Sequence, residues 1–212
     1  MTVDCAQDHI AMLGQHLLSH PEPMPTAEDL YANAEFELEP DGPPIPAAVL
    51  IALIEREAGY SVLYTARSSA LRRHSGQVAF PGGRIDPEDP DAAHAALREA
   101  NEEVALRTGD ARVLGYMPYY FTGTNYFITP VVAIVEPSAP FVPNPDEVVD
   151  VFEVSLARLS DRANWGQFEA THGAKRWRSW HIDHNRHRIW GITADLTLRF
   201  CDLLRRSAEP RR

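Results

Sequence analysis

Segments with strand and helix patterns alternate along this 212-residue chain, and that alternation constrains its fold more than any other feature. A long helix is predicted from about Asp91 to Leu106, and an amphipathic helix closes the chain. Residues 165–190 alternate aromatic and polar side chains, as a hairpin would. Strand-like apolar runs occur at 47–55, 61–66, 77–80, 111–120, 126–136 and, leading into a short helix, 147–156. Interleaved in this way, the elements predict a mixed α/β or α+β sandwich with a mixed sheet.

The residues before the first strand are predicted to form an extension. Apolar residues at helical spacing predict a helix over about 5–18, and Thr26 with Asp29 resembles a capping box that opens a short second helix. Residues 36–45 are rich in proline and acid, which is typical of a linker. The predicted divisions are an N-terminal helical extension with its linker, one main domain and a disordered tail, with bounds 1–44, 45–206 and 207–212.

Composition and charge exclude several classes of protein. Hydrophobic residues make up 44% of the chain, enough for a sizeable core, and the two cysteines, Cys5 and Cys201, are far apart and lack metal-ligand spacing. The net charge of −10 argues against a general nucleic-acid binder, which needs a basic surface. The longest apolar stretch, residues 45–54, is too short to cross a bilayer, and the N-terminus has no signal-peptide pattern. We therefore expect a cytoplasmic protein that binds neither nucleic acid nor membrane.

The predicted helix after Asp91 concentrates acidic residues. At about 100° per residue, its alanines form a narrow stripe facing the core, Glu99 and Glu103 lie side by side at one edge of that stripe, and Glu102 lies further round. Arg98 projects from the other flank. Such acids often form only a solvated face, but hard cations such as Mg²⁺ or Mn²⁺ prefer several oxygen ligands. The glycine-rich segment FPGGR just before the helix favours the metal-binding alternative.

Gly83, Asp89 and the segment REANEEVAL from Arg98 onward resemble the Nudix box. That box reads Gly, five residues, Glu, seven residues, Arg-Glu, an aliphatic residue, any residue, Glu-Glu, any residue, Gly and an aliphatic residue. This chain departs from the pattern in three ways. Its first acid is Asp89 or Glu88, the gap from Asp89 to Arg98 is one residue longer, and Ala105 replaces the last glycine. The core glutamates are all present.

Upstream, the segment RSSALRRHSGQVAFPGG from Arg67 to Gly83 resembles the signature of the coenzyme A pyrophosphatase branch of the Nudix superfamily. Members of that branch also tend to show the one-residue shift in the box. Three later stretches, TNYFITPVVA, NPDEV and IWGITA, are similar to further landmarks of the branch. The resemblance covers about residues 45–200.

The resemblance implies a Nudix α/β/α sandwich that hydrolyses the pyrophosphate of coenzyme A or acyl-CoA to 3′,5′-ADP and 4′-phosphopantetheine or its acyl form. It also implies a Mg²⁺ or Mn²⁺ cofactor, with Glu99 and Glu103 as the chief metal ligands, Glu102 assisting and the Gly82 carbonyl as a further ligand. Arg98 would orient these glutamates. The bound metal would polarise the pyrophosphate and activate water.

Residues 61–85 contain four arginines and no acid, although the whole chain is acidic. This local positive charge suits an anionic ligand, because arginine binds phosphate oxygens through two hydrogen bonds at once. The candidate substrate-binding residues are Arg67, Arg72, Arg73 and His74. The alternative is that one or two of them only pair with surface acids.

Three other groups of residues invite a functional interpretation. The spacing of His181, His184 and His187 fits neither a zinc finger nor a His-Glu-x-x-His helix, so a hairpin turn through residues 183–185 is predicted there instead. The aromatic residues 119–121 could stack on an adenine, although aromatics in a strand are more often part of the core. Glu147 is a candidate for an additional acid.

Two other functions stay open. A Nudix enzyme could act on another nucleoside diphosphate derivative, such as ADP-ribose or NADH, and a Nudix-like domain could sense a nucleotide without cleaving it. Sensing domains usually lose box acids, whereas Glu99, Glu102 and Glu103 are all present here. The expected partner is therefore a small molecule, coenzyme A or a related nucleotide, and the sequence is compatible with a homodimer.

Overall fold

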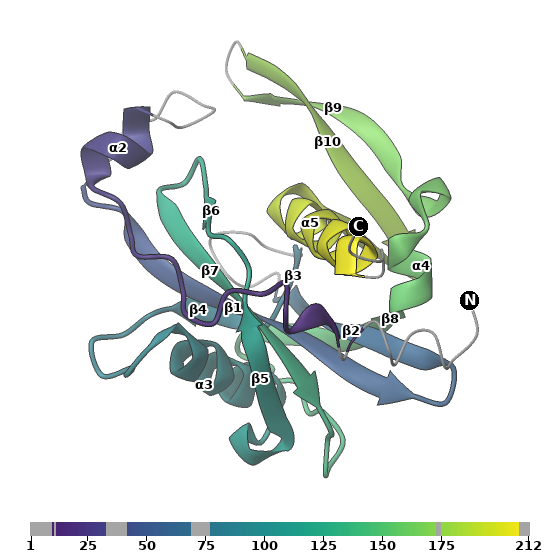
Figure 1. Ribbon diagram of the computed structural model, residues 1–212. Helices are drawn as coiled ribbons and strands as arrows, with labels where there is room; N and C mark the ends of the chain where they lie inside the picture. Colours follow the sequence, from purple (N-terminus) through teal and green to yellow (C-terminus); the bar gives the residue numbers. More distant parts are fainter. Residues whose placement is uncertain (1–9, 11, 33–41, 69–76, 173–174, 208–212) are drawn as a thin grey trace.

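The computed structural model describes residues 10, 12–32, 42–68, 77–172 and 175–207, and it confirms a mixed α+β fold (Figure 1). The main sheet contains β1 (Ile45–Arg56), β2 (Gly59–Arg67), β3 (Val78–Ala79), β4 (Gly82–Arg84), β5 (Ala111–Tyr116), β6 (Tyr120–Phe121), β7 (Tyr126–Val135) and β8 (Val148–Ser155). A second sheet contains β9 (Gly166–His172), β10 (Lys175–His184) and β11 (His187–Trp190). The helices are α2 (Ala27–Ala32), α3 (Ala92–Val104), α4 (Leu156–Ser160) and α5 (Gly191–Ser207), with short 3-10 turns η1 (Thr108–Asp110) and η2 (Arg162–Asn164). Within the described ranges, no helix has the length and apolar character that crossing a membrane requires.

The main sheet is built on β1, which lies parallel to β7 and antiparallel to β2. β1 and β2 pair with each other only near their connecting turn, where residues 53–56 face residues 59–62. Further along, the two strands separate, and two short strands occupy the gap between them. β3 pairs with Thr65 and Ala66 of β2, and β4 pairs with residues 47–49 of β1. The glycine-rich segment is therefore held inside an opening of the sheet, next to α3.

Side chains of β1 enter two separate cores, because successive residues of a strand point to opposite faces. The even-numbered residues from Ala48 to Ile54 pack in the core under α3, whereas Ile51 and Leu53 pack in the core under α5. Figure 1 shows α3 and α5 on opposite sides of the main sheet. β1 is thus a central strand covered on both faces.

The N-terminal extension packs on the main sheet. Ile10, Leu13 and Leu17 are buried in the core on the α5 side. In the described part of the helix predicted over residues 5–18, however, helical structure ends at Leu13. Leu18 is extended and exchanges two backbone hydrogen bonds with Tyr116, at 2.8 and 2.9 Å. The prediction was wrong for the last turn because pairing with β5 satisfies these backbone groups in place of helical hydrogen bonds.

The capping box predicted at Thr26 is present. The Asp29 backbone N–H donates to Thr26 Oγ1 at 3.1 Å, and α2 begins at the next residue, Ala27. Most of the predicted linker lies outside the described residues, and Ile45 already belongs to β1.

The segment predicted to form a late hairpin is a three-stranded antiparallel sheet. The hairpin of β10 and β11 is confirmed, but its turn is at Asn185, whose φ is +53°, and Arg186. The predicted turn through residues 183–185 was placed too early, because Asp183 and His184 still pair with β11. His187 Nε2 lies 2.6 Å from a carboxylate oxygen of Asp150 in β8, and its ring stacks on Phe152 with 4.3 Å between centroids. These contacts join the second sheet to β8 of the main sheet.

Replacing His187 with Ala is expected to lower the free energy of unfolding by about 1–2 kcal/mol, because the hydrogen bond to Asp150 and the stacking on Phe152 are both lost. His184→Asn is the matched control and should leave turnover nearly unchanged. Urea denaturation measures the first effect and steady-state hydrolysis the second. Stoichiometric zinc in the purified protein, lost on substitution of His184, would contradict a purely structural role for these histidines.

Candidate active site

Helix α3 carries the box glutamates, and its two ends and its alanine face fix their positions. The Asp91 side chain accepts a hydrogen bond from the His94 backbone N–H at 2.9 Å and caps the start of the helix. Small side chains on one face are buried against the sheet: Ala92, Ala93, Ala95, Ala96 and Ala100. This close packing brings Glu99 and Glu103 to β4.

Glu103 is a buried carboxylate with 2% of its side chain exposed. It accepts a hydrogen bond from the Gly82 backbone N–H at 3.3 Å, and Arg67 Nη1 lies 3.6 Å from its other oxygen. Burial raises the pKa of Glu103 to about 8; Arg67 and the Gly82 N–H oppose this rise, whereas the negative charges of Glu99 and Glu147 add to it. One hydrogen bond and one ion pair therefore do not offset the burial of this carboxylate.

Glu99 lies one helical turn earlier and faces Gly83. A Cβ atom at position 83 would lie 2.4 Å from the Glu99 carboxylate, so a larger residue there would displace it. Burial raises the pKa of Glu99 above its ordinary value, against the effect of the neighbouring Arg98. The two glycines thus act differently: Gly82 donates its N–H to Glu103, and Gly83 leaves room for Glu99.

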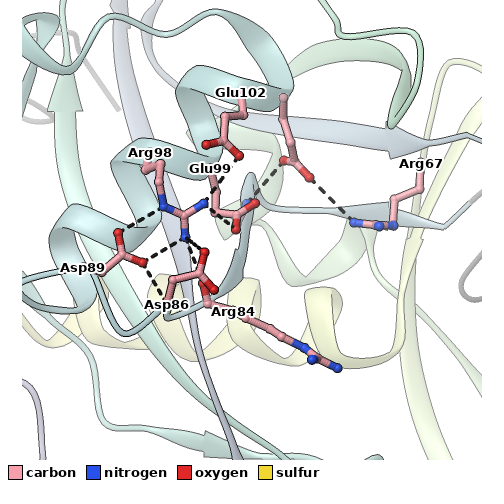
Figure 2. Close-up of polar contacts among 9 residues, drawn as sticks. Arg67, Arg84, Asp86, Asp89, Arg98, Glu99 and Glu102 are labelled. Carbon is pink, nitrogen blue, oxygen red and sulfur yellow. Dashed lines mark hydrogen bonds and ion pairs between the residues drawn. The ribbon is translucent and has the colours of Figure 1, made fainter.

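Arg98 connects the carboxylates to the loop between β4 and α3 (Figure 2). Its Nε and Nη2 donate to the two oxygens of Asp89 at 3.0 and 2.9 Å, and Nη2 also donates to the Arg84 carbonyl at 3.1 Å. Its Nη1 donates to Glu99 at 3.0 Å and, more weakly, to Glu102 at 3.4 Å. The hydrogen bonds from Arg98 hold the pKa of Asp89 below its ordinary value. Arg98 therefore restrains the position of Glu99.

A further carboxylate, Glu147, approaches from the loop before β8. Its backbone N–H donates to the Asn144 carbonyl at 3.0 Å, and its carbonyl accepts from the Ser68 N–H at 2.8 Å. The Asn144 N–H in turn donates to the Glu103 carbonyl at 2.9 Å. The charge of Glu147 contributes to the raised pKa of both Glu99 and Glu103. The loop is thus fastened between α3 and the end of β2, and Glu147 belongs to the same electrostatic site.

Of the four predicted substrate-binding residues, the structure places Arg67, whereas residues 72–74 lie outside the described residues. Arg67 follows an irregularity in the pairing of β2 with β8, and its guanidinium lies beside Glu103 (Figure 2). Tyr119, one of the aromatic candidates, stacks on Phe127 with 4.6 Å between centroids. Its neighbour Tyr120 donates a hydrogen bond to Asp195 at 3.0 Å, so both side chains take part in packing.

A sequence profile described as the NUDIX domain matches residues 44–177, which is more than half of the chain. The chain belongs to the Nudix family. The protein named uncharacterized Nudix hydrolase NudL from Escherichia coli strain K12 is 40% identical over 150 residues, covering 71% of this chain and 78% of NudL. NudL of Escherichia fergusonii is 39% identical over 150 residues with the same coverage. Among solved structures, the Nudix hydrolase RenU from M. smegmatis is 21% identical over 55% of this chain and 74% of its own, with a TM-score of 0.46.

The structure shows the contacts and conformation of the residues at which this chain departs from the Nudix box. Of the two candidates for the first acid, Asp89 binds Arg98 through both oxygens and has 7% of its side chain exposed, whereas Glu88 is exposed. Ala105, which replaces the box glycine, adopts a left-handed conformation with φ +57° as α3 ends. Its N–H donates to the Asn101 carbonyl at 2.9 Å. The helix thus ends with a left-handed residue, as helices that end in glycine do, although the residue here is alanine.

Ala105→Gly is expected to raise the free energy of unfolding by about 0.5–1 kcal/mol, because the left-handed conformation penalises a Cβ atom more than glycine loses in backbone entropy. The control is Ala100→Gly in the body of the same helix, which should lower the free energy of unfolding by about 1 kcal/mol or more. Urea denaturation of both variants measures the difference. A destabilising Ala105→Gly would contradict the strained cap.

The donor set of this Nudix site fits a divalent cation. Mg²⁺ usually keeps several waters and uses one or two protein carboxylates. Glu99 and Glu103 offer two carboxylates, and burial raises the pKa of each despite the nearby arginines. In the described part of the chain, no three or more His, Cys, Asp or Glu side chains are grouped so as to hold a metal by themselves.

Proposed function

We propose that this Nudix protein is a divalent-metal-dependent hydrolase that cleaves the pyrophosphate of coenzyme A or acyl-CoA. The products would be 3′,5′-ADP and 4′-phosphopantetheine or its acyl form. The observation that carries the hydrolase assignment is the pair of glutamates that face Gly83 and Gly82 of β4: Glu99, with 16% of its side chain exposed, and the fully buried Glu103. A protein that only sensed a nucleotide would have no use for two carboxylates held at the cost of burial.

In this proposal, Glu99 and Glu103 are the chief ligands of Mg²⁺ or Mn²⁺, with Glu102 and the Gly82 carbonyl assisting. When bound, the metal supplies polarisation of the pyrophosphate and activation of water. Arg98 orients Glu99 through its hydrogen bond of 3.0 Å and is itself fixed by Asp89. Glu147 contributes an additional acid at the same place.

The coenzyme A assignment rests on the sequence from Arg67 to Gly83 and on the local positive charge of residues 61–85. Coenzyme A differs from dephospho-coenzyme A by one 3′-phosphate, which only a cationic contact can read. Arg67, Arg72, Arg73 and His74 are the proposed substrate-binding residues. A hydrogen bond between charged partners contributes about 1.5–3 kcal/mol, or roughly ten- to a hundredfold in specificity.

Product analysis with Mg²⁺ or Mn²⁺ tests this proposal. The purified protein is incubated with coenzyme A, dephospho-coenzyme A, ADP-ribose and NADH in parallel, and kcat/KM is measured for each. We expect coenzyme A to be preferred over the dephospho form by roughly ten- to a hundredfold, with at least one of Arg67→Ala, Arg72→Ala and Arg73→Ala shrinking that preference. Preference for ADP-ribose or NADH would reassign the substrate. Nucleotide binding without any hydrolysis would instead support a protein that senses a nucleotide.

A further inference from the structure

Arg84, the last residue of β4, projects to the face of the sheet opposite the carboxylates. The preceding residue, Gly83, faces α3, since a Cβ atom there would meet Glu99 at 2.4 Å. Successive residues of a strand point to opposite faces, so the Arg84 side chain lies on the side of α5. Figure 2 shows its guanidinium directed away from Arg98, Glu99 and Glu102.

The Arg84 guanidinium is exposed and has donors to spare. Its Cζ lies 5.9 Å from the ring centroid of Tyr126, and its Nη2 donates to the Tyr126 hydroxyl at 3.4 Å. Among the residues that the structure describes, no carboxylate lies within the 4.0 Å of an ion pair with it. An arginine has five N–H donors in a planar fork, and within the described part of the chain one of them, on Nη2, has a hydrogen-bond acceptor. Contact with the Tyr126 ring restricts the position of the guanidinium, and this contact uses none of the remaining N–H donors.

The backbone of Arg84 is fixed relative to the carboxylate site. Its carbonyl accepts from Arg98 Nη2 at 3.1 Å, the same guanidinium that holds Glu99. Within the sheet, Arg84 lies opposite Ala47 of β1. Any ligand group that contacts Arg84 is therefore held at a set distance from the site of hydrolysis.

A second arginine–tyrosine pair lies on the same face. Tyr120 is opposite Ile128, and Ile128 shares its face of β7 with Tyr126. Arg199 of α5 lies over the Tyr120 ring, with its Cζ 4.8 Å from the centroid. Diagonal neighbours on adjacent strands are about 7–8 Å apart, so the two pairs are neighbours on this face, where Asp195 also accepts a hydrogen bond from the Tyr120 hydroxyl.

We propose that Arg84, stacked on Tyr126, binds a phosphate of the nucleotide substrate other than the pyrophosphate that is cleaved. This rests on the proposed function, and for coenzyme A it assigns the ribose 3′-phosphate to Arg84 instead of Arg67, whose guanidinium lies beside Glu103. The cleaved pyrophosphate is held at Glu99 and Glu103, on the opposite face of β4, so Arg84 contacts a separate anionic group. A phosphate offers the oxygen pair that matches the two-pronged donor of arginine.

The test compares Arg84→Gln and Arg84→Lys with Arg56→Gln, a matched control in which the replaced arginine is exposed and paired with Glu153 at 2.7 Å. The ratio of kcat/KM for coenzyme A to that for dephospho-coenzyme A should fall roughly tenfold in Arg84→Gln. It should fall less in Arg84→Lys, which keeps the charge but loses the fork, and should not change in Arg56→Gln. Melting temperatures within a few degrees of wild type establish that all three variants are folded.

A binding assay separates this inference from the hydrolase assignment. Calorimetry without metal measures the affinity of wild type and variants for 3′,5′-ADP and for 5′-AMP, which differ by the 3′-phosphate. Wild type should bind 3′,5′-ADP more tightly, and Arg84→Gln should lose roughly tenfold of that advantage. An unchanged advantage in Arg84→Gln overturns the role of Arg84 even if coenzyme A is hydrolysed. Absence of hydrolysis in wild type overturns the proposed function, whereas the binding difference still decides the role of Arg84.

Discussion

Glu103→Gln and Glu99→Gln are each expected to lower turnover at least a hundredfold, about 3 kcal/mol in activation free energy, while the protein stays folded. Glutamine keeps the shape of the side chain but removes the negative charge that a divalent cation needs. Folding should survive because both carboxylates are partly or fully withdrawn from water, and burial and neighbouring negative charges raise the pKa of each. Steady-state hydrolysis with Mg²⁺ or Mn²⁺ measures the loss, and excess chelator should abolish the activity of wild type in the same way.

The matched control for these two variants is Glu88→Gln. Glu88 lies in the loop that precedes α3 and was a candidate for the first box acid, but it is exposed and Asp89 takes the contacts with Arg98. We expect Glu88→Gln to keep turnover close to that of wild type. Full turnover by Glu103→Gln, or by wild type in chelator, would refute the metal site.

The same pair of glutamates should make the stability of the metal-free protein depend on pH. The pKa of Glu103 is about 8 in the folded protein, against an ordinary 4.5, so between these values the folded state holds a proton that the unfolded chain has released. The free energy of unfolding should therefore fall as pH rises through this window, and Glu103→Gln should remove that slope. At a hundred times its dissociation constant, Mg²⁺ should restore about 2.7 kcal/mol to wild type. Thermal melts from pH 5 to pH 8, with and without Mg²⁺, measure both effects.

Local pattern was sufficient to predict the elements that carry the site. The alanine stripe placed α3 within two residues at each end, because a single buried face fixes a helix whatever it packs against. The unbroken apolar run of β1 likewise identified a strand. The three-stranded second sheet was only partly predicted, because the pairing of β9 with β10 joins residues that local alternation does not connect. Leu18 shows the same limit, since its extended conformation depends on its partner Tyr116.

In the site too, some features could be predicted from residue spacing and others depend on the tertiary structure. The placement of Glu99 and Glu103 on one edge of the helix follows from four-residue spacing alone. The choice between Glu88 and Asp89 does not, because the loop conformation decides which side chain reaches Arg98. Arg84 was counted among the arginines of residues 61–85 but had no assigned role. Its direction becomes clear only when the structure shows which face Gly83 occupies.

Gly82→Ala and Gly83→Ala should separate the structural from the chemical requirement for the glycine pair. Gly82 has φ +157°, and a Cβ atom there would lie 2.4 Å from the Ala48 carbonyl oxygen and 2.7 Å from the Val49 Cα. Both obstacles are backbone atoms of β1, which is buried on both faces and cannot yield. Gly82→Ala is therefore expected to lower the free energy of unfolding by about 3 kcal/mol, visible as a lowered melting temperature.

Gly83→Ala should have the opposite profile, with little loss of stability and a large loss of activity. The atoms that its Cβ would meet, at 2.4 to 2.6 Å, are those of the Glu99 carboxylate, which can rotate away at the expense of its hydrogen bond with Arg98. A displacement of about 1 Å in a reacting group is enough to lower turnover on the order of a hundredfold. Gly109→Ala is the control, because nothing lies within 4 Å of its added Cβ. Equal melting temperatures for Gly82→Ala and Gly83→Ala would contradict the separate roles of the two glycines. Undiminished turnover by Gly83→Ala would show that Glu99 does not need the space that Gly83 leaves.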